Sequence, residues 1–216
     1  PDRHQVHGQY FLCISVLARQ RAGTYTAPEG GGERGVFMSE NILEIKNLSV
    51  EFRTFDGVVK AINGMSFDVP RGKTVGLVGE TGAGKTTTAL SVMGLVQSPP
   101  GVITEGEILF DGEDLLKAGE AKLRKYRGDK ISMIFQNPMT SLNPVYTVGR
   151  QIANVIMQHQ NVNKAEAEKR AGDMLEVVGI PRERTANYPH EFSGGMRQRV
   201  CIAMGLACNS EFDERA

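Results

Sequence analysis

The sequence contains little cysteine, no tryptophan and no excess of either charge, and these absences exclude several classes of protein. Its 216 residues include three cysteines, at Cys13, Cys201 and Cys208. They are too few and too far apart for a disulfide framework or a cysteine-ligated metal site. Lysine and arginine number 25, as do aspartate and glutamate, so no positive field favours nucleic acid as the main partner. No apolar run approaches the roughly 20 residues of a membrane-spanning helix. We therefore expect a globular chain with reduced thiols and no direct membrane insertion.

Composition and periodicity divide the chain into four segments. Residues 1–37 follow no clear period and end in a glycine-rich stretch, so we expect an unstructured or non-native N-terminal extension. Residues 38–138 are rich in alternating apolar patterns and form the predicted core. Residues 139–192 carry apolar side chains at helical spacing and are expected to form a helical subdomain. Residues 193–216 are predicted to be a helix followed by an aberrant tail.

Within these segments, local patterns predict particular strands and helices. Strands are expected at residues 43–52, 65–69, 74–78, 108–110 and 131–135. The first strand contains a slip near Asn47, and the nearly all-apolar run at 74–78 is typical of a buried parallel strand. Helices are expected at 85–96, from Asn163, where a capping-box pattern with Glu166 begins one, and from Ser193 to about Ala207.

A glycine-rich loop between the strand at 74–78 and the helix after it predicts a nucleotide site. Residues 79–86 read GETGAGKT, which fits the phosphate-loop pattern in the strand-loop-helix context that its mechanism needs. Glycines allow close backbone approach to phosphate, the helix N-terminus attracts the anion, the lysine reaches the β- and γ-phosphates, and the following hydroxyl ligates Mg²⁺. The predicted site comprises Gly79, Glu80, Thr81, Gly82, Ala83, Gly84, Lys85, Thr86 and Thr87.

Two further motifs follow in order along the chain. Residues 135–144 read FQNPMTSLNP, in which Gln136 follows a predicted strand and is placed to contact Mg²⁺ or the attacking water. Residues 193–199 read SGGMRQR. Ser193 caps the next helix, and the two glycines after it leave the helix N-terminus open as a second anion site.

The order of the three motifs identifies a resemblance to a known family. From about Ile42 to Asn209 the chain resembles the ATP-binding subunits of ABC transporters, and most of all those of dipeptide, oligopeptide and nickel importers. The resemblance implies an α/β fold: a P-loop NTPase core of ABC ATPase type, with an antiparallel β subdomain, a parallel sheet and an inserted α-helical lobe. It implies ATP and Mg²⁺ as cofactors, and a function as the ATPase subunit that powers import of peptides across the cytoplasmic membrane.

The resemblance also assigns roles to single residues. Gln136 becomes the Q-loop glutamine and, with Thr86, a metal-site residue. The signature motif, which binds ATP held by a partner subunit, is formed by Ser193, Gly194, Gly195 and Met196. Its usual leading leucine is Phe192 here. Phe55 stands near the place where the family stacks an aromatic ring on adenine, and Phe52 is the rival for that role.

Two kinds of partner follow from the same resemblance. A second ATP-binding subunit, identical or related, would complete two ATP sites. Membrane permease subunits would contact residues 139–143 through a cytoplasmic helix, which places the chain on the inner face of the cell membrane as a peripheral subunit. A plain turn before a helix also explains this segment, because Asn137-Pro138 and Asn143-Pro144 favour turns.

Beyond Asn209 the sequence departs from the family pattern. The family continues with an apolar strand ending in Asp-Glu, whose glutamate is the general base, and with a switch histidine. Asp213-Glu214 is a poor substitute because no apolar strand precedes it. We therefore expect a truncated core and impaired hydrolysis, since a general base contributes about 10²–10⁴-fold.

Two alternative functions stay open at the level of sequence. One is a catalytically inactive fragment that only binds nucleotide or a partner. The other is a non-transport ABC-type ATPase of DNA repair or translation, which the neutral charge, the short helical lobe and the MTSLNP segment disfavour.

Overall fold

The computed structural model describes residues 10–14, 40–80, 82–135 and 137–207. The chain forms two compact units, Pro1–Leu123 and Arg124–Ala216. Within the described ranges, no helix combines the length and the apolar content that crossing a membrane requires.

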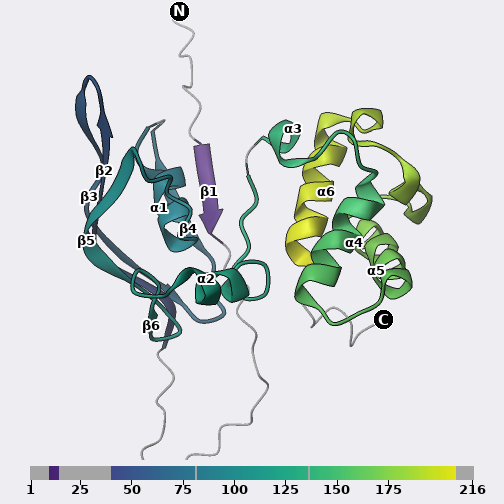
Figure 1. The fold of residues 1–216 in the computed structure, drawn as a ribbon, viewed down its shortest axis with the longest axis horizontal. Helices are drawn as coiled ribbons and strands as arrows, with labels where there is room; N and C mark the ends of the chain where they lie inside the picture. Colours follow the sequence, from purple (N-terminus) through teal and green to yellow (C-terminus); the bar gives the residue numbers. More distant parts are fainter. Residues whose placement is uncertain (1–9, 15–39, 81, 136, 208–216) are drawn as a thin grey trace, which may run out of the picture. The chain divides into compact units, whose positions relative to one another are not determined.

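A four-stranded antiparallel sheet dominates the N-terminal unit (Figure 1). Its spatial order is β3 (Gly57–Pro70), β2 (Asn41–Thr54), β5 (Gly101–Phe110) and β6 (Glu113–Asp114). One face of the sheet supplies the core through alternating apolar side chains, which are fully buried at Leu43, Ile45, Leu48, Val50 and Ile108. The expected strands at 43–52, 65–69 and 108–110 are therefore confirmed, each inside a longer strand.

The irregularity that the sequence predicts near Asn47 is also present. The register of β2 against β3 shifts between Ile45 and Leu48, and Asn47 has a positive φ of 49°. Gly106 on β5 lies against this bulge, where a Cβ atom would come within 2.6 Å of the Leu48 Cα. The absence of a side chain at Gly106 thus lets β5 follow the bulged strand closely.

A second, two-stranded sheet pairs β1 (Tyr10–Ile14) with β4 (Val75–Gly79). This pairing corrects two expectations. Part of the segment expected to be unstructured forms a strand, consistent with the high β-propensity of its run YFLCI. The strand expected to be buried and parallel pairs antiparallel, and Val78 is 54% exposed. A strand is buried on both faces only when other elements cover both, and within the described part of its unit β4 has one strand neighbour.

Helix α1 (Lys85–Val92) follows β4 and contacts it. It ends four residues before the predicted end at residue 96. Gly94, with φ 60°, donates its N–H to the Ser91 carbonyl, and Leu95 donates to the Leu90 carbonyl. This is a Schellman motif, in which a left-handed glycine closes the helix.

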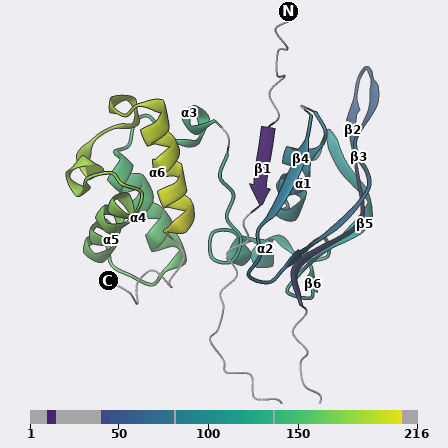
Figure 2. The ribbon, with the colours of Figure 1, turned by 180° about the vertical axis from the view of Figure 1, so that it is seen from behind.

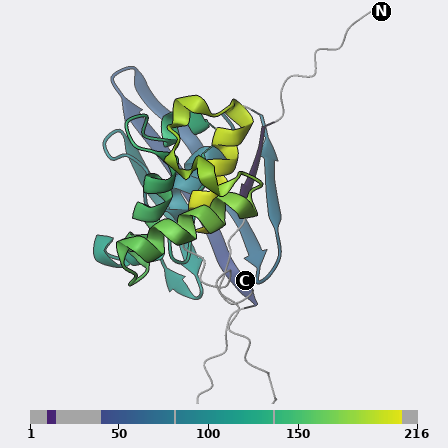
Figure 3. The same cartoon turned by 90° about the vertical axis from the view of Figure 1, so that its right-hand side faces the viewer.

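The C-terminal unit is helical and is seen from two perpendicular directions in Figures 1 and 3. Helix α2 (Glu120–Tyr126) spans the boundary between the units. The other helices are α3 (Pro138–Ser141), α4 (Val148–His159), α5 (Lys164–Val177), the 3-10 turns η1 (Arg182–Ala186) and η2 (Pro189–Glu191), and α6 (Gly194–Leu206). Helices α4, α5 and α6 contact one another around one core cluster, which includes Val148, Ile152, Ile156, Leu175, Ile180 and Val200.

The expected strand at 131–135 is wrong. Ile131 makes only an isolated parallel bridge with Arg127, and the residues after it form no ladder. The segment lies against α6 instead, because the Ser132 hydroxyl donates to the Gly205 carbonyl at 3.0 Å and the Ile134 side chain packs on Gly205. An apolar run alone does not distinguish a strand from an extended segment packed on a helix.

Candidate functional site

The phosphate loop joins the end of β4 at Gly79 to the start of α1 at Lys85. Gly82 and Gly84 have φ angles of 86° and 78°, which only glycine adopts readily. A Cβ atom at Gly84 would lie 2.5 Å from the Ala61 carbonyl oxygen of β3, whereas one at Gly82 would meet nothing within 4 Å. The loop is therefore packed on β3 at one glycine and open at the other.

Lys85 lies folded across this loop. Its side chain is 7% exposed, and Nζ donates to the carbonyl oxygens of Gly79 and Glu80, both at 2.6 Å. The backbone thus holds the ammonium group over the loop that precedes it. An incoming phosphate competes with these two carbonyls for the same donors, and a charged acceptor makes the stronger hydrogen bond.

The first turn of α1 offers its N–H groups to an anion. Its N-cap is Gly84, so no side chain caps the first turn. Thr86 is exposed, while Thr88 is buried and donates its hydroxyl to the Gly84 carbonyl at 2.9 Å. An uncapped helix N-terminus, a glycine loop and a lysine form the kind of cradle that suits a triphosphate, and the role of the Thr86 hydroxyl at Mg²⁺ stays a prediction.

The third predicted motif, at residues 193–199, opens helix α6. Ser193 is the N-cap and accepts from the Met196 N–H at 3.4 Å. Gly194 and Gly195 are exposed, and a Cβ at either would meet nothing within 4 Å. Phe192 is 2% exposed with the Arg184 guanidinium over its ring, so it fills an apolar site as a leucine would. The start of α6 therefore presents an open turn beside a fixed apolar side chain.

Glu191 stabilises the turn that leads into this motif. It accepts from the Tyr188 N–H at 2.5 Å and from the Asn187 side-chain amide at 2.6 Å. These two hydrogen bonds lower the pKa of the Glu191 carboxyl below its usual range. The entry to Ser193 is thus fixed by a charged acceptor.

Apart from the aromatic candidates, the predicted site residues fall in three groups: the phosphate loop, the signature motif and two residues outside the described ranges. Gly79, Glu80, Gly82, Ala83 and Gly84 form the loop that continues into Lys85, Thr86 and Thr87 of α1, and the signature residues lie together at the start of α6. Thr81 and Gln136 lie outside the described residues, so their roles stay predictions.

The two aromatic candidates for adenine stacking lie at different places on the β2–β3 hairpin, whose tip is seen in Figure 2. Phe55 is in the two-residue turn and fully exposed, whereas Phe52 is half-buried and pairs with Val59. Val50 pairs with Ile62, beside the point where Gly84 meets β3. At about 3.4 Å per residue, Phe52 is about 7 Å along β2 from Val50, whereas Phe55 lies beyond the end of the strand at Thr54. Both roles stay predictions.

Sequence reasoning missed Gln151, which holds the turn after α3. Its buried amide donates from Nε2 to the carbonyls of Asn143 and Tyr146 and accepts from the Asn143 N–H, each at 2.9 Å. The turn leaves Val145 69% exposed. A polar residue three positions after Val148, on the apolar face of a helix, was the available signal.

Comparisons with known proteins agree on one family. The family model described as ABC transporter matches residues 62–213. The chain is 50% identical over 170 residues to the oligopeptide transport ATP-binding protein OppD of Bacillus subtilis (strain 168), covering 78% of this chain and 48% of that protein. It is 47% identical over 174 residues to the dipeptide transport ATP-binding protein DppD of the same strain, covering 80% of this chain and 52% of that protein.

A solved structure of an ATP-binding cassette has a similar fold. It is the dimeric post-hydrolysis state of the ATP-binding cassette MJ0796 bound to ADP and Pi, with a TM-score of 0.67 and 25% identity, covering 77% of this chain and 70% of that chain. The chain spans about half the length of the two curated relatives. The family model covers more than half of the chain and includes both the phosphate loop and the signature helix, and this chain belongs to the ABC transporter family.

Proposed function

We propose that this chain is the ATP-binding portion of an ABC importer that moves peptides across the cytoplasmic membrane. The observation that carries the proposal is the phosphate loop, where Lys85 and the uncapped start of α1 converge on one cradle. The names of the two relatives, oligopeptide and dipeptide transport ATP-binding proteins, support peptides as the transported class.

In this proposal the loop binds ATP through its backbone and one cation. Backbone N–H groups of the loop and of the first turn of α1 would hold the phosphates, and Lys85 would donate to phosphate oxygens in place of its two carbonyl partners. Thr86 and Gln136 are the chain's contributions to the metal site. Bound Mg²⁺ supplies positive charge to the phosphates.

The start of α6 recognises ATP held by another ATP-binding subunit. Ser193 donates from its hydroxyl, and the open amides at Gly194 and Gly195 meet the γ-phosphate. The dimeric state of the related cassette supports such a partner.

Transport requires that nucleotide state reaches a membrane permease. We place that contact at residues 139–143 and the turn that Gln151 holds, next to the exposed Val145. The chain is thereby peripheral on the inner face of the membrane. ATP hydrolysis by the assembled subunit belongs to the same proposal.

Nucleotide titration with the purified chain tests the central step. Lys85→Ala removes the cation from the loop, and we expect Mg²⁺-ATP affinity to fall at least ~10-fold, since a charge-assisted contact is worth roughly 1.5–3 kcal/mol. Lys73→Ala is the matched control, because Lys73 is an exposed lysine before β4. Equal affinity of the Lys85 variant and the wild type would refute the proposed site.

Turnover of Mg²⁺-ATP, measured on the same variants, tests whether this chain hydrolyses ATP. Asp213-Glu214 follows no apolar strand and is a poor substitute for the general base that the family uses, so we expect no turnover above the Lys85→Ala background. Turnover that the Lys85 substitution abolishes would mean that another carboxylate completes the site, and the prediction of impaired hydrolysis would be wrong.

A transplant tests the transport role. Residues 42–207 of this chain replace the matching segment of the Bacillus subtilis oligopeptide transport ATP-binding protein, and uptake of a labelled peptide is measured. We expect uptake that the Lys85→Ala substitution eliminates. A stable, ATP-binding chimera without uptake would count against peptide import.

A further inference from the structure

Helix α6 packs into the core of its unit through buried side chains such as Val200 and Ala203. In addition, two separated hydrogen-bond contacts link it to the segments that follow α5 and α4. Near its middle, Arg199 Nη1 donates to the carbonyls of Gly179 at 3.1 Å and Val178 at 3.3 Å, just after α5. At its C-terminal end, Gln160 Nε2 donates to the Ala207 carbonyl at 3.2 Å. Gln160 is the C-cap residue of α4, so the second contact links the ends of two helices.

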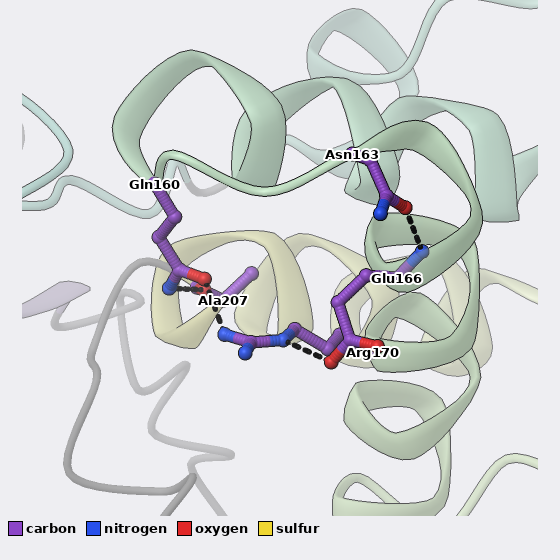
Figure 4. Close-up of polar contacts among 5 residues, drawn as sticks. All are labelled: Gln160, Asn163, Glu166, Arg170 and Ala207. Carbon is purple, nitrogen blue, oxygen red and sulfur yellow. Dashed lines mark hydrogen bonds and ion pairs between the residues drawn. The ribbon is translucent and has the colours of Figure 1, made fainter.

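The Gln160 amide is itself held by α5 (Figure 4). Arg170 donates from Nη1 to Gln160 Oε1 at 2.7 Å, and from Nε to Glu166 Oε1 at 2.9 Å. The Glu166 N–H in turn donates to the Asn163 side chain, which caps α5, at 2.9 Å. The Glu166 carboxylate accepts from Arg170. The capping box is therefore represented by the hydrogen bond from the Glu166 N–H to the Asn163 side chain.

These contacts fix which way the Gln160 amide faces. Arginine has donors only, so the oxygen of the amide faces Arg170 and its nitrogen faces the carbonyl of Ala207. The guanidinium polarises the amide and strengthens the bond that its nitrogen donates. The Ala207 carbonyl has no partner within α6, because it lies at the helix C-terminus, where positive charge is also favoured.

We propose that Gln160 and Arg170 are positioning residues that hold the C-terminal end of α6 and thereby set the direction of the signature motif at its other end. The inference rests on the proposed role of Ser193 and the glycines after it in recognising ATP of a partner subunit. The inference adds two residues that orient this motif: Gln160, which follows α4, and Arg170 of α5.

The geometry of a helix gives the size of the effect. At 1.5 Å per residue, Ser193 lies about 9 Å and Ala207 about 12 Å from Arg199 along α6. With Arg199 and the buried Val200 as the pivot, a displacement of about 2 Å at Ala207 moves Ser193 by about 1.5 Å. A binding constellation tolerates only about 0.5 Å, so loss of the distal contact misaligns the motif.

The substitution Gln160→Glu tests this directly. It preserves shape and keeps an acceptor for Arg170, but it places a carboxylate oxygen in front of the Ala207 carbonyl instead of a donor. Gln158→Glu is the matched control, because Gln158 is an exposed glutamine of the same helix and the change in charge is equal. Arg170→Met is the second variant, used in addition and in case Gln160→Glu does not fold.

Hydrogen exchange without nucleotide measures the attachment. We expect the amides of the last turn of α6, including the Ala207 N–H that donates to Ala203, to exchange at least ~10-fold faster in Gln160→Glu and Arg170→Met, with the interiors of α4 and α5 unchanged. Unchanged exchange in α6, or an equal rise over the whole helical unit, overturns the inference, because the first shows no attachment and the second a general structural role.

Nucleotide-driven association then measures whether the signature motif is correctly oriented for ATP of a partner chain. We expect Gln160→Glu to weaken Mg²⁺-ATP-dependent self-association at least ~10-fold while the affinity of the chain's own phosphate loop stays at the wild-type value. Wild-type association in a variant whose α6 is loosened overturns the positioning role alone. Absence of association in the wild-type chain, with ATP bound, overturns the signature function between two copies of this chain and this inference with it.

Discussion

Gly84 is the residue at which the phosphate loop is least tolerant of change. It combines a φ of 78° with a backbone carbonyl 2.5 Å from where a Cβ would stand. Left-handed geometry costs an alanine roughly 1–2 kcal/mol, and forced overpacking adds roughly 1–3 kcal/mol. We expect Gly84→Ala to lower the free energy of unfolding by about 3 kcal/mol and to displace the loop that binds nucleotide.

A comparison with Gly82 separates the cost of left-handed backbone geometry from the cost of overpacking against β3. Its φ is also positive, at 86°, but no atom lies within 4 Å of an added Cβ. Gly82→Ala should therefore lower the free energy of unfolding by only about 1 kcal/mol. Urea denaturation of both variants is the measurement, and equal losses would show that the contact with β3 does not matter.

At the scale of elements, Gln151 decides the conformation of the turn after α3. Gln151→Leu leaves one N–H and two carbonyls, at Asn143 and Tyr146, without the amide that satisfies them. We expect a loss of roughly 2–3 kcal/mol in the free energy of unfolding, and faster exchange of the Asn143 amide. Asn154→Leu, an exposed position of the same helix, is the control and should change neither quantity.

How well the sequence predicted each element depended on how local its determinants were. The strands at 43–52 and 65–69, the cap at Asn163 and the helix from Ser193 follow from neighbouring residues, and the structure has all of them. The strand predicted at 131–135 is wrong because Ser132 and Ile134 contact Gly205 of α6, some 70 residues later in the chain, and the segment pairs with no strand. The predicted end of α1, at residue 96, was also wrong, although the residue that ends the helix, Gly94, can be read from the sequence.

The candidate site divides in the same way. The phosphate loop and the signature are contiguous motifs whose chemistry is written in consecutive residues, so the sequence alone locates them. Gln160 acts through a hydrogen bond to the Ala207 carbonyl, 47 residues later in the chain, and no pattern in one sequence reveals such a pair. Residues that position a motif are therefore harder to predict than the motif itself.

At the scale of the whole molecule, three carboxyls of the helical unit link its stability to pH. Arg170 lowers the pKa of Glu166, Arg182 lowers that of Glu176, and the Tyr188 amide lowers that of Glu191. A depressed pKa contributes stability that is fully present above the unfolded value, about 4.3 for glutamate, and is lost as pH falls through the folded value. We expect the helical unit to lose stability progressively below that pH.

Glu166→Gln isolates one of these contributions. The variant should be less stable than the wild type at pH 7, where the ionised carboxylate pairs with Arg170 at 2.9 Å. The difference should be smaller at pH 3, because the contribution is lost as the pH falls through the depressed pKa of Glu166. Chemical denaturation at both values measures it. A difference of the same size at both pH values would mean that the Glu166 carboxylate charge contributes nothing.

Nucleotide should affect the two units under different conditions. The phosphate loop lies in the N-terminal unit and the signature in the C-terminal unit, and the proposed function assigns them to ATP molecules held by different chains. At 100 times its dissociation constant, Mg²⁺-ATP stabilises the unit that binds it by about 2.7 kcal/mol. That protection of the loop should not depend on protein concentration, because it involves one chain.

Protection at the signature should depend on protein concentration, because it requires a second chain. Hydrogen exchange of Gly194 and Gly195 is the measurement, with Mg²⁺-ATP at saturation and the protein concentration varied. We expect protection to appear only in the range where the chain self-associates, and Lys85→Ala to remove it by emptying the partner's loop. Protection of equal size at every concentration would instead place both motifs on one nucleotide of the same chain, which the proposed dimer does not permit.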